Sequence, residues 1–240
     1  MREATILRND GDIVAVAKPP GMKTVAESGG RDVLSEAGKL TGVRGLRPVH
    51  RLDRDTSGAL LFAANAETEK SLTDLFRTRS VTKRYLGITL GVPFNRTGMI
   101  NRRLSEWDGG RKPVRVVKGN GGLEASTGYR ILATGRFPPG DVEAGLIMFL
   151  PHQGRTHQIR VHAAAFGYPL LGDDQYGDRS ANRTAKERLG LSRQALHSWN
   201  LSFPWRDGVL EIACDPPEDL ADAIRLLFGE VDLSALLERS

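Results

Sequence analysis

The feature that most constrains the fold is an apolar run that directly follows a polar, turn-forming stretch. The run covers residues 59–64 and reads ALLFAA, and the stretch before it covers residues 50–58 and reads HRLDRDTSG. Asp, Thr, Ser and Gly favour turns, whereas a short continuous apolar run is typical of a strand that is buried on both faces. The sequence therefore predicts a loop that is fixed at the start of a buried strand.

One carboxylate in that loop has an unusual charge environment. Asp53 has His50, Arg51 and Arg54 around it in the sequence, and Asp55 follows. Neighbouring cations favour the ionised form of a carboxyl group, and a loop attached to a rigid strand can aim it. Asp53 is therefore a candidate reactive group. The alternative that these residues leave open is an ordinary ion pair in a loop.

Hydrophobic periodicity predicts short strands and helices along the rest of the chain. Residues 11–25 indicate a strand, a Pro-Pro-Gly turn at 19–21 and a second short strand. In the strand that we expect at 83–93, Tyr85 lies on the face opposite to that of Leu86 and Ile88. The other expected elements are helices at 33–40, 66–79, 156–166 and 216–228, a short helix that ends near Gly190, a last short helix, and strands at 126–134, 143–150 and 196–204.

A second block rich in polar residues covers residues 152–177 and reads HQGRTHQIRVHAAAFGYPLLGDDQYG. We expect Thr156 to cap a helix that runs to Phe166. Arg160 lies in the opening turns of that helix, so the helix pattern alone makes it a surface arginine. The expected inner stripe of the helix consists of Ile159, Ala163 and Phe166.

The charge balance permits a polyanionic partner without requiring one. Lys and Arg number 34 against 29 Asp and Glu, which gives a net charge of +5 in 240 residues. Residues 98–122 are rich in Gly and cations and contain Trp107, which is a composition that can grip a nucleic-acid backbone. A solvated hairpin without a partner fits this segment equally well. The cations in question are Arg102, Arg103, Arg111, Lys112, Arg115 and Lys118.

Several classes of protein are disfavoured by what the sequence lacks. Cys214 is the only cysteine, so an intramolecular disulfide and a cysteine-rich metal site are excluded. The N-terminal residues contain no apolar run of the kind found in signal peptides, and no segment has the ~20 apolar residues of a membrane span. We therefore expect a cytoplasmic protein with no membrane contact. No P-loop and no GxGxxG fingerprint is present, so no nucleotide cofactor is implied.

These segments, in this order, resemble the RluA family of pseudouridine synthases. The family's HRLDxxTSG motif matches residues 50–58, and its Lys-x-Tyr matches Lys83 to Tyr85. Its later motifs match GRTHQIRVH at 154–162, GYPLLGDDQYG at 167–177 and LHSWNLSFP at 196–204. The resemblance covers roughly residues 10–204. Many members have a small RNA-binding module before this block, and we expect that module to be missing because only about ten residues precede it.

The resemblance implies an α+β fold with a mixed, largely antiparallel sheet, peripheral helices and two sub-lobes around a basic cleft. We expect one catalytic domain over residues 1–240, in which residues 205–240 form a C-terminal strand and helical extension. The implied activity is isomerisation of uridine in ribosomal or transfer RNA to pseudouridine, without a cofactor or metal. By the same resemblance Asp53 is the catalytic residue, Tyr85 packs on the target uracil and accepts a proton, and Arg160 pairs with Asp53.

Further residues are expected to bind the substrate. The partner implied by the resemblance is an RNA stem-loop that presents a flipped uridine to a monomeric enzyme. Arg54, next to Asp53, is placed to fill the space that the flipped base leaves. The six cations between Arg102 and Lys118 are expected to contact the RNA backbone. The substrate-binding candidates are His50, Arg51, Arg54, Arg155, Thr156 and His157.

Three other interpretations were weighed. His152, His157 and His162 are spaced by five residues, which on a helix or a strand does not bring them to one metal. Paired acids could indicate a glycosidase, but adjacent or i,i+2 carboxylates do not obviously face each other across a sugar. An RNA-binding protein or RNA chaperone that kept the fold without the activity remains open, although binding alone would need neither Asp53 nor Tyr85.

Overall fold

The computed structural model describes residues 3–26, 30–140 and 142–238. The chain forms two compact units. Unit 1 consists of Met1–Arg84 and His197–Pro216, and unit 2 consists of Tyr85–Leu196 and Pro217–Ser240. Two of the three boundaries fall inside strands, β5 (Thr82–Leu90) and β9 (Leu196–Trp205), and the third lies at Pro216 before the last helices.

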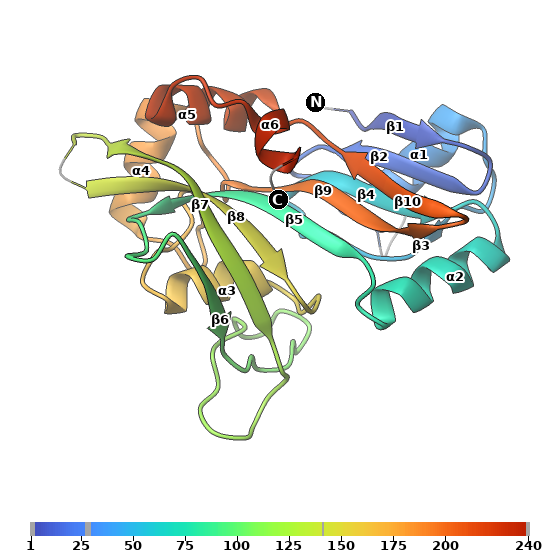
Figure 1. Cartoon of the computed structure of the whole chain (residues 1–240), viewed down its shortest axis with the longest axis horizontal. Coiled ribbons are helices and arrows are strands. Elements are labelled where there is room, and N and C mark those ends of the chain that lie inside the picture. Colours follow the sequence, from blue (N-terminus) through green and yellow to red (C-terminus); the bar gives the residue numbers. More distant parts are fainter. Residues whose placement is uncertain (1–2, 27–29, 141, 239–240) are drawn as a thin grey trace. The chain divides into compact units, whose positions relative to one another are not determined.

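Unit 1 is built on a sheet in which β2 pairs with β1 and β4, and β4 pairs with β9. β10 pairs with β9, and the short β3 pairs with β4. All these pairings are antiparallel except that of β4 with β9. Figure 1 shows α1 beside β1 and β2, and α2 beside β3 and β4. The bounds are β1 Thr5–Asn9, β2 Ile13–Lys18, β3 Arg47–Pro48, β4 Ser57–Ala63, β10 Gly208–Ala213, α1 Val33–Thr41 and α2 Ala66–Arg77.

The apolar run of the sequence forms the centre of unit 1. All seven residues of β4 are buried, as a continuous apolar run predicts for a strand that is covered on both faces. Asn65 caps α2 with its side chain, which accepts a hydrogen bond from the backbone N–H of Thr68, and the helix buries Leu72. Leu61 and Leu72 belong to one core cluster together with residues from β2, β9 and β10.

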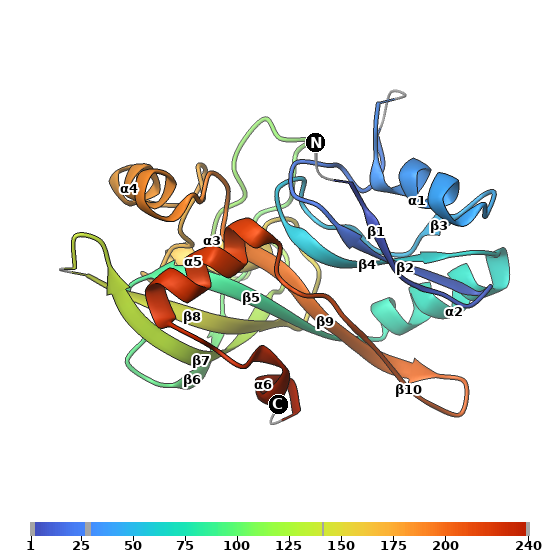
Figure 2. The ribbon, with the colours of Figure 1, turned by 90° about the horizontal axis from the view of Figure 1, so that it is seen from above.

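In its described residues, unit 2 contains antiparallel strands in the order β5-β8-β7-β6, of which β5 begins in unit 1, and the helices α3 to α6. α3 and α5 both contact β7 and β8, and α5 also contacts α4 (Figure 2). The bounds are β6 Thr97–Asn101, β7 Ser126–Phe137, β8 Val142–Pro151, α3 Gln158–Ala165, α4 Arg179–Leu189, α5 Glu218–Phe228 and α6 Leu233–Glu238.

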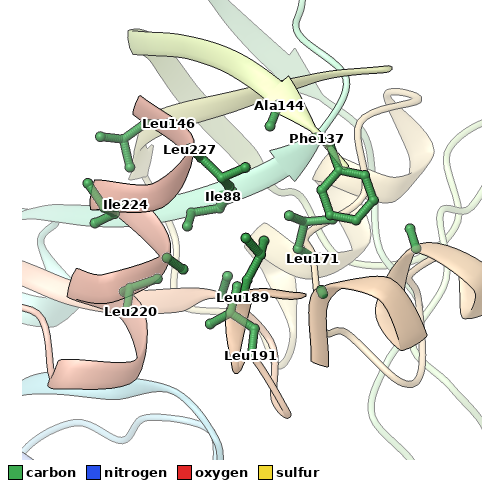
Figure 3. Close-up of a cluster of buried hydrophobic side chains, with 14 residues drawn as sticks. Ile88, Phe137, Ala144, Leu146, Leu171, Leu189, Leu191, Leu220, Ile224 and Leu227 are labelled. Carbon is green, nitrogen blue, oxygen red and sulfur yellow. The ribbon is translucent and has the colours of Figure 1, made fainter. Parts of the chain in front are cut away.

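A core cluster of unit 2 lies between its sheet and the helices α4 and α5. Leu220, Ile224 and Leu227 of α5 point toward Ile88 and Leu146 of the sheet (Figure 3). The i, i+4, i+7 spacing of the three α5 residues puts them on one helix face, which explains why this segment forms a helix against the sheet. α4 contributes its small residues and its last leucine to the same cluster, namely Ala181, Ala185 and Leu189.

The predicted α+β class with a largely antiparallel sheet is confirmed, and most predicted elements are present. Three expectations were wrong. After the Pro-Pro-Gly turn Lys23 makes only an isolated bridge to Asp32, so no second strand follows it. Thr156 does not cap α3, because the N-cap is His157 in a left-handed conformation with φ 58°, and it makes no capping hydrogen bond through its side chain. Phe166 is 41% exposed and so does not belong to the buried stripe.

Across the described ranges, none of the helices combines the length and the apolar character that a membrane crossing requires.

Candidate active site

The loop that carries Asp53 is held by its backbone on both sides of that residue. On one side, the Thr24 hydroxyl accepts a hydrogen bond from the N–H of Leu52 at 3.2 Å and donates to the carbonyl of Leu52 at 3.3 Å. On the other side, the carbonyl of Arg54 accepts from the Lys18 ammonium at 2.7 Å and from the N–H of Gly21 at 2.9 Å. The segment 18–24, which follows β2, therefore fixes the position of the carboxylate-bearing residue.

Lys18 is the least expected part of this support. The residue is only 1% exposed, and its ammonium group also donates to the carbonyl of Pro19 at 2.9 Å. A buried charge is costly unless it is hydrogen-bonded. The carbonyls of Pro19 and Arg54 therefore stabilise the buried ammonium group, and the ammonium group in turn fixes the positions of these two carbonyls. The loop is closed within itself by a bond of 3.1 Å from the N–H of Thr56 to the carbonyl of Asp53.

His50 serves to hold the loop and does not supply a positive charge. Its Nε2 accepts a hydrogen bond from the N–H of Leu61 at 3.0 Å, and its ring stacks on Phe76 with centroids 4.6 Å apart. Burial, and then repulsion from Lys83, lowers the pKa of His50 to about 3. The ring is therefore neutral near pH 7. The expectation that three cations surround Asp53 was wrong for this residue.

The two arginines of the motif extend toward solvent. Arg51 and Arg54 are exposed, while Asp53 is partly buried. The guanidinium of Arg54 lies against the carboxylate of Asp55, with nitrogen–oxygen distances of 3.2–3.3 Å. The guanidinium of Arg54, adjacent to Asp53 in the chain, therefore stays in contact with water.

The end of the motif is locked into the sheet of unit 1. The Ser57 hydroxyl and His197 Nδ1 are 2.9 Å apart, and His197 Nε2 is 2.8 Å from the carbonyl of Cys214. Because a carbonyl only accepts, Nε2 carries the proton and Nδ1 accepts from the hydroxyl. Gly58, with φ 120°, lies so close to Ser198 that a Cβ would come within 2.2 Å of its carbonyl oxygen. Only glycine fits there.

Tyr85 and Lys83 lie two residues apart on β5. Tyr85, in unit 2, is 9% exposed and is paired in register with Phe149 of β8. Lys83, in unit 1, has a pKa that burial, and then repulsion from Arg79, lowers to about 8. The strand expected at 83–93 is confirmed as β5, and Tyr85 and Leu86 on its opposite faces are both buried.

Arg160 is buried within unit 2 and is held by a carboxylate that the sequence reasoning did not assign to it. Its Nε and Nη2 each donate to one oxygen of Asp173 at 2.8 Å, and its guanidinium lies 5.1 Å from the ring centroid of Tyr176. The residue is 7% exposed, so the helix pattern that made it a surface arginine was misleading. A bidentate pair of this kind fixes both the position and the plane of the guanidinium.

The same network extends to His157. Asp173 also accepts from the backbone N–H groups of Gln175 and Tyr176 at 3.1 Å, and the Tyr176 hydroxyl is 2.9 Å from Nδ1 of His157. In the sequence, these contacts are indicated only by the presence of Asp173 and Tyr176 in the segment GDDQYG. Hydrophobic periodicity does not predict which side chains such loop residues contact. Of the other substrate-binding candidates, Arg155 is exposed and donates to the carbonyl of Glu124, and Thr156 is partly buried.

The basic segment after β6 is exposed, as expected. Five of its six cations are exposed and Arg103 is half-buried, with donors on the carbonyls of Gly121 and Gly122. Leu104 anchors the segment through isolated bridges to Val116 and Leu123. Among the described residues, no group of three or more His, Cys, Asp or Glu side chains is arranged to hold a metal ion.

Comparison with known proteins identifies the family. The family model for RNA pseudouridylate synthase matches residues 12–165. The chain belongs to the RNA pseudouridylate synthase family. Asp53, Tyr85 and Arg160 all lie inside the matched range. As a member of this family of the RluA type, the protein is an RNA-modifying isomerase that converts uridine in RNA to pseudouridine.

Individual relatives agree with this assignment. Ribosomal large subunit pseudouridine synthase D of Zymomonas mobilis is 32% identical over 235 residues, which covers 92% of this chain and 72% of the relative. An uncharacterised RNA pseudouridine synthase of Mycobacterium bovis is 36% identical over 237 residues, with 94% and 73% covered. The solved structure of human RNA pseudouridylate synthase domain containing 1 matches with a TM-score of 0.77 and 26% identity, covering 99% of this chain and 94% of that one.

Proposed function

We propose that the substrate of this pseudouridine synthase is large-subunit ribosomal RNA and that Asp53 is its catalytic residue. The proposal of the substrate is supported by relatives that are named for ribosomal large subunit RNA and match most of the chain. The proposal for Asp53 is supported by the backbone of its loop, which is hydrogen-bonded at Leu52 and at Arg54. Such fixation is what a group that must meet one sugar carbon needs.

The chemistry assigns a task to each proposed residue. The uracil must detach from the ribose, rotate and rejoin it through a ring carbon. Asp53 attacks the anomeric carbon or removes the 2′ proton of the sugar, and both routes are open. Tyr85 then accepts or relays the proton that leaves the ring carbon. Arg160 is the proposed partner that orients the carboxylate of Asp53. Within unit 2, Asp173 and Tyr176 keep the guanidinium in a fixed orientation for that task.

Release of tritium tests the substrate and the reaction together. Large-subunit ribosomal RNA transcribed with uridine tritiated at the ring carbon that joins the sugar in pseudouridine should lose tritium to water when the enzyme is added. Small-subunit ribosomal RNA and transfer RNA are the matched controls. Release from the controls alone would contradict the proposed substrate, release of free uracil would indicate a hydrolase, and no release from any RNA would indicate a silent binding protein.

We further propose that the enzyme acts as a monomer and recognises a stem-loop that presents the uridine. Sequence-specific RNA recognition generally targets such loops, because the major groove of an A-form helix is too narrow for side chains. The exposed cations between Arg102 and Lys118 are the proposed outer contact with phosphates. Turnover of a short isolated hairpin cut from the modified RNA would support this, and activity confined to an assembled ribosomal particle would contradict it.

A further inference from the structure

Three cations occupy one face of α4 in unit 2. Arg179, Arg183 and Lys186 are spaced at i, i+4 and i+7, so at 100° per residue their directions fall within about 60° of one another. The inner face of the same helix carries Ala181, Ala185 and Leu189, which pack into the core cluster shown in Figure 3. One face of α4 is therefore apolar and packs into the core of unit 2, and a second face is cationic.

The three cations border a cavity of about 400 Å³. Its wall also contains Asp174, Asn182 and Ser192. Among the described residues of the wall Asp174 is the only acid, so three positive charges face one negative charge. A cavity of this size is larger than one phosphate group needs and resembles the small end of ligand pockets in proteins.

None of the three cations is used inside the described part of the chain. The side chains of Arg179, Arg183 and Lys186 make no hydrogen bond and no ion pair with any described residue. Arg193 differs from these three cations because its guanidinium is bound by Asp219 of α5. Its backbone packs against Gly172 in the wall of the cavity. The cations around the cavity are thus available to an anion from outside the protein.

The cavity adjoins the network that holds Arg160. Asn182 of α4 accepts from the N–H of Gly172 at 2.8 Å and donates to the carbonyl of Asp173 at 2.9 Å. Asp173 binds Arg160, and the next residue, Asp174, borders the cavity. Gly172, with φ 73°, lies so close to Arg193 that a Cβ would come within 2.0 Å of its carbonyl oxygen, so the loop is held tightly against this wall.

We propose that this cavity binds backbone phosphates of the RNA, at nucleotides next to the target uridine. Arginine and lysine are the usual partners of phosphate oxygens, and contacts to phosphates position a nucleic acid without reading its sequence. No aromatic side chain lines the cavity among the described residues, so it offers no platform for a base. The inference rests on the RNA substrate of the proposed function and adds a second contact to it.

The salt dependence of binding tests this directly. The probe is a fluorescein-labelled stem-loop RNA with one uridine in its loop, titrated at several NaCl concentrations with wild type, R183Q/K186Q and R136Q/R188Q. Arg188 lies on α4 but outside the cavity wall and Arg136 lies on β7, so the last variant removes the same charge elsewhere. Loss of two phosphate contacts should reduce the slope of log affinity against log salt by about 1.4, and weaken binding several-fold at low salt.

The proposal requires that R183Q/K186Q lowers the slope and that the control variant keeps the wild-type slope. Equal slopes for all three proteins, or equal losses in both variants, would overturn it. Binding of inorganic phosphate at the cavity without any effect of R183Q/K186Q on RNA affinity would also overturn it, in favour of a small anion. RNA binding is measured without turnover, so comparing the slopes tests the role of the cavity even if the wild-type protein releases no tritium.

Discussion

At the scale of single residues, the most informative side chains are buried polar groups outside the best-matched motif. Lys18 and Thr24 fix the two peptide carbonyls that flank Asp53, although neither belongs to residues 50–58. Their role follows from hydrogen bonds across more than 25 positions of the chain. A catalytic carboxylate must be placed within fractions of an ångström, so such supports should affect rate more than RNA affinity.

Lys18→Met tests that support. The substitution keeps the length of the side chain but leaves the carbonyls of Arg54 and Pro19 without this donor. We expect the single-turnover rate to fall by about 10²-fold, the size associated with misplacement of a reacting group by ~1 Å, while RNA affinity is retained. Rapid-quench measurement of pseudouridine at a temperature where circular dichroism shows a folded variant checks this. A wild-type rate would show that the loop keeps its position without Lys18.

His50 gives a prediction about pH and stability. Its pKa is about 3 in the folded protein and near 6.5 when the chain is unfolded, so the unfolded chain takes up a proton first as the pH falls. The free energy of unfolding should therefore decrease between about pH 6.5 and pH 3, by up to ~1.4 kcal/mol per pH unit from this group. Urea unfolding of wild type and His50→Gln at pH 7 and pH 5 measures the difference.

Gln is the suitable replacement because its amide oxygen can still accept from the N–H of Leu61 but does not titrate. The variant should lose less stability than wild type between the two pH values. Identical losses in the two proteins would mean that His50 is protonated in the fold.

Residue types could be recognised from the sequence more readily than their partners. Asp53 and Tyr85 were found by their place in ordered strings of residues. The partner of Arg160 was missed because Asp173 lies 13 positions away in a loop, where no periodicity relates the two. Lys18 was not predicted to support the loop, because a fully buried lysine is rare. Its role is visible only from the hydrogen bond that it donates to the carbonyl of Arg54, 36 positions away.

At the scale of elements, α5 is attached to the rest of unit 2 by more than its apolar face. Asp219 in its first turn binds Arg193 through two hydrogen bonds of 2.9 and 3.2 Å, and Arg193 also donates to the carbonyls of Gln194 and Leu196. Both side chains are largely buried. The pair therefore fixes the start of α5 against the segment that leads into β9.

Arg193→Met should cost about 3 kcal/mol of unfolding free energy, because it leaves the Asp219 carboxylate buried without its partner. The matched control is Arg225→Met, which removes an exposed i,i+3 partner of Asp222 on the same helix and should cost well under ~1 kcal/mol. Chemical denaturation of the two variants compares them. Equal costs would contradict the view that burial makes the first pair matter.

Element positions followed from periodicity wherever an apolar pattern was long. α2 and α5 fell close to their expected ranges since each has a repeating apolar face and a recognisable end, and α4 ends at Gly190 as expected. The wrong predictions concern places where the conformation or pairing of one residue determines the local structure. His157 adopts φ 58° and takes the N-cap position from Thr156, and an extended stretch at Lys23 pairs through one bridge only. Neither outcome has a signal in hydrophobic patterning.

At the scale of the whole molecule, the proposed catalytic residues are divided between the two units. Asp53 belongs to unit 1, and Tyr85 and Arg160 belong to unit 2. The predicted pairing of Arg160 with Asp53 stays a prediction. Hydrogen bonds within unit 1 hold the loop of Asp53, and hydrogen bonds within unit 2 hold Arg160. The proposed reaction requires both units, and it makes the carboxylate of Asp53 the one group whose chemistry cannot be replaced.

Asp53→Asn is the most direct test of that central claim. Asparagine keeps the size of the side chain and removes the charge that attacks the sugar or takes its proton, so folding and RNA affinity should equal those of wild type. Pseudouridine formation, followed by tritium release from large-subunit ribosomal RNA under single-turnover conditions, should then be undetectable. Retention of more than a trace of pseudouridine formation by the purified variant would contradict a catalytic role for Asp53.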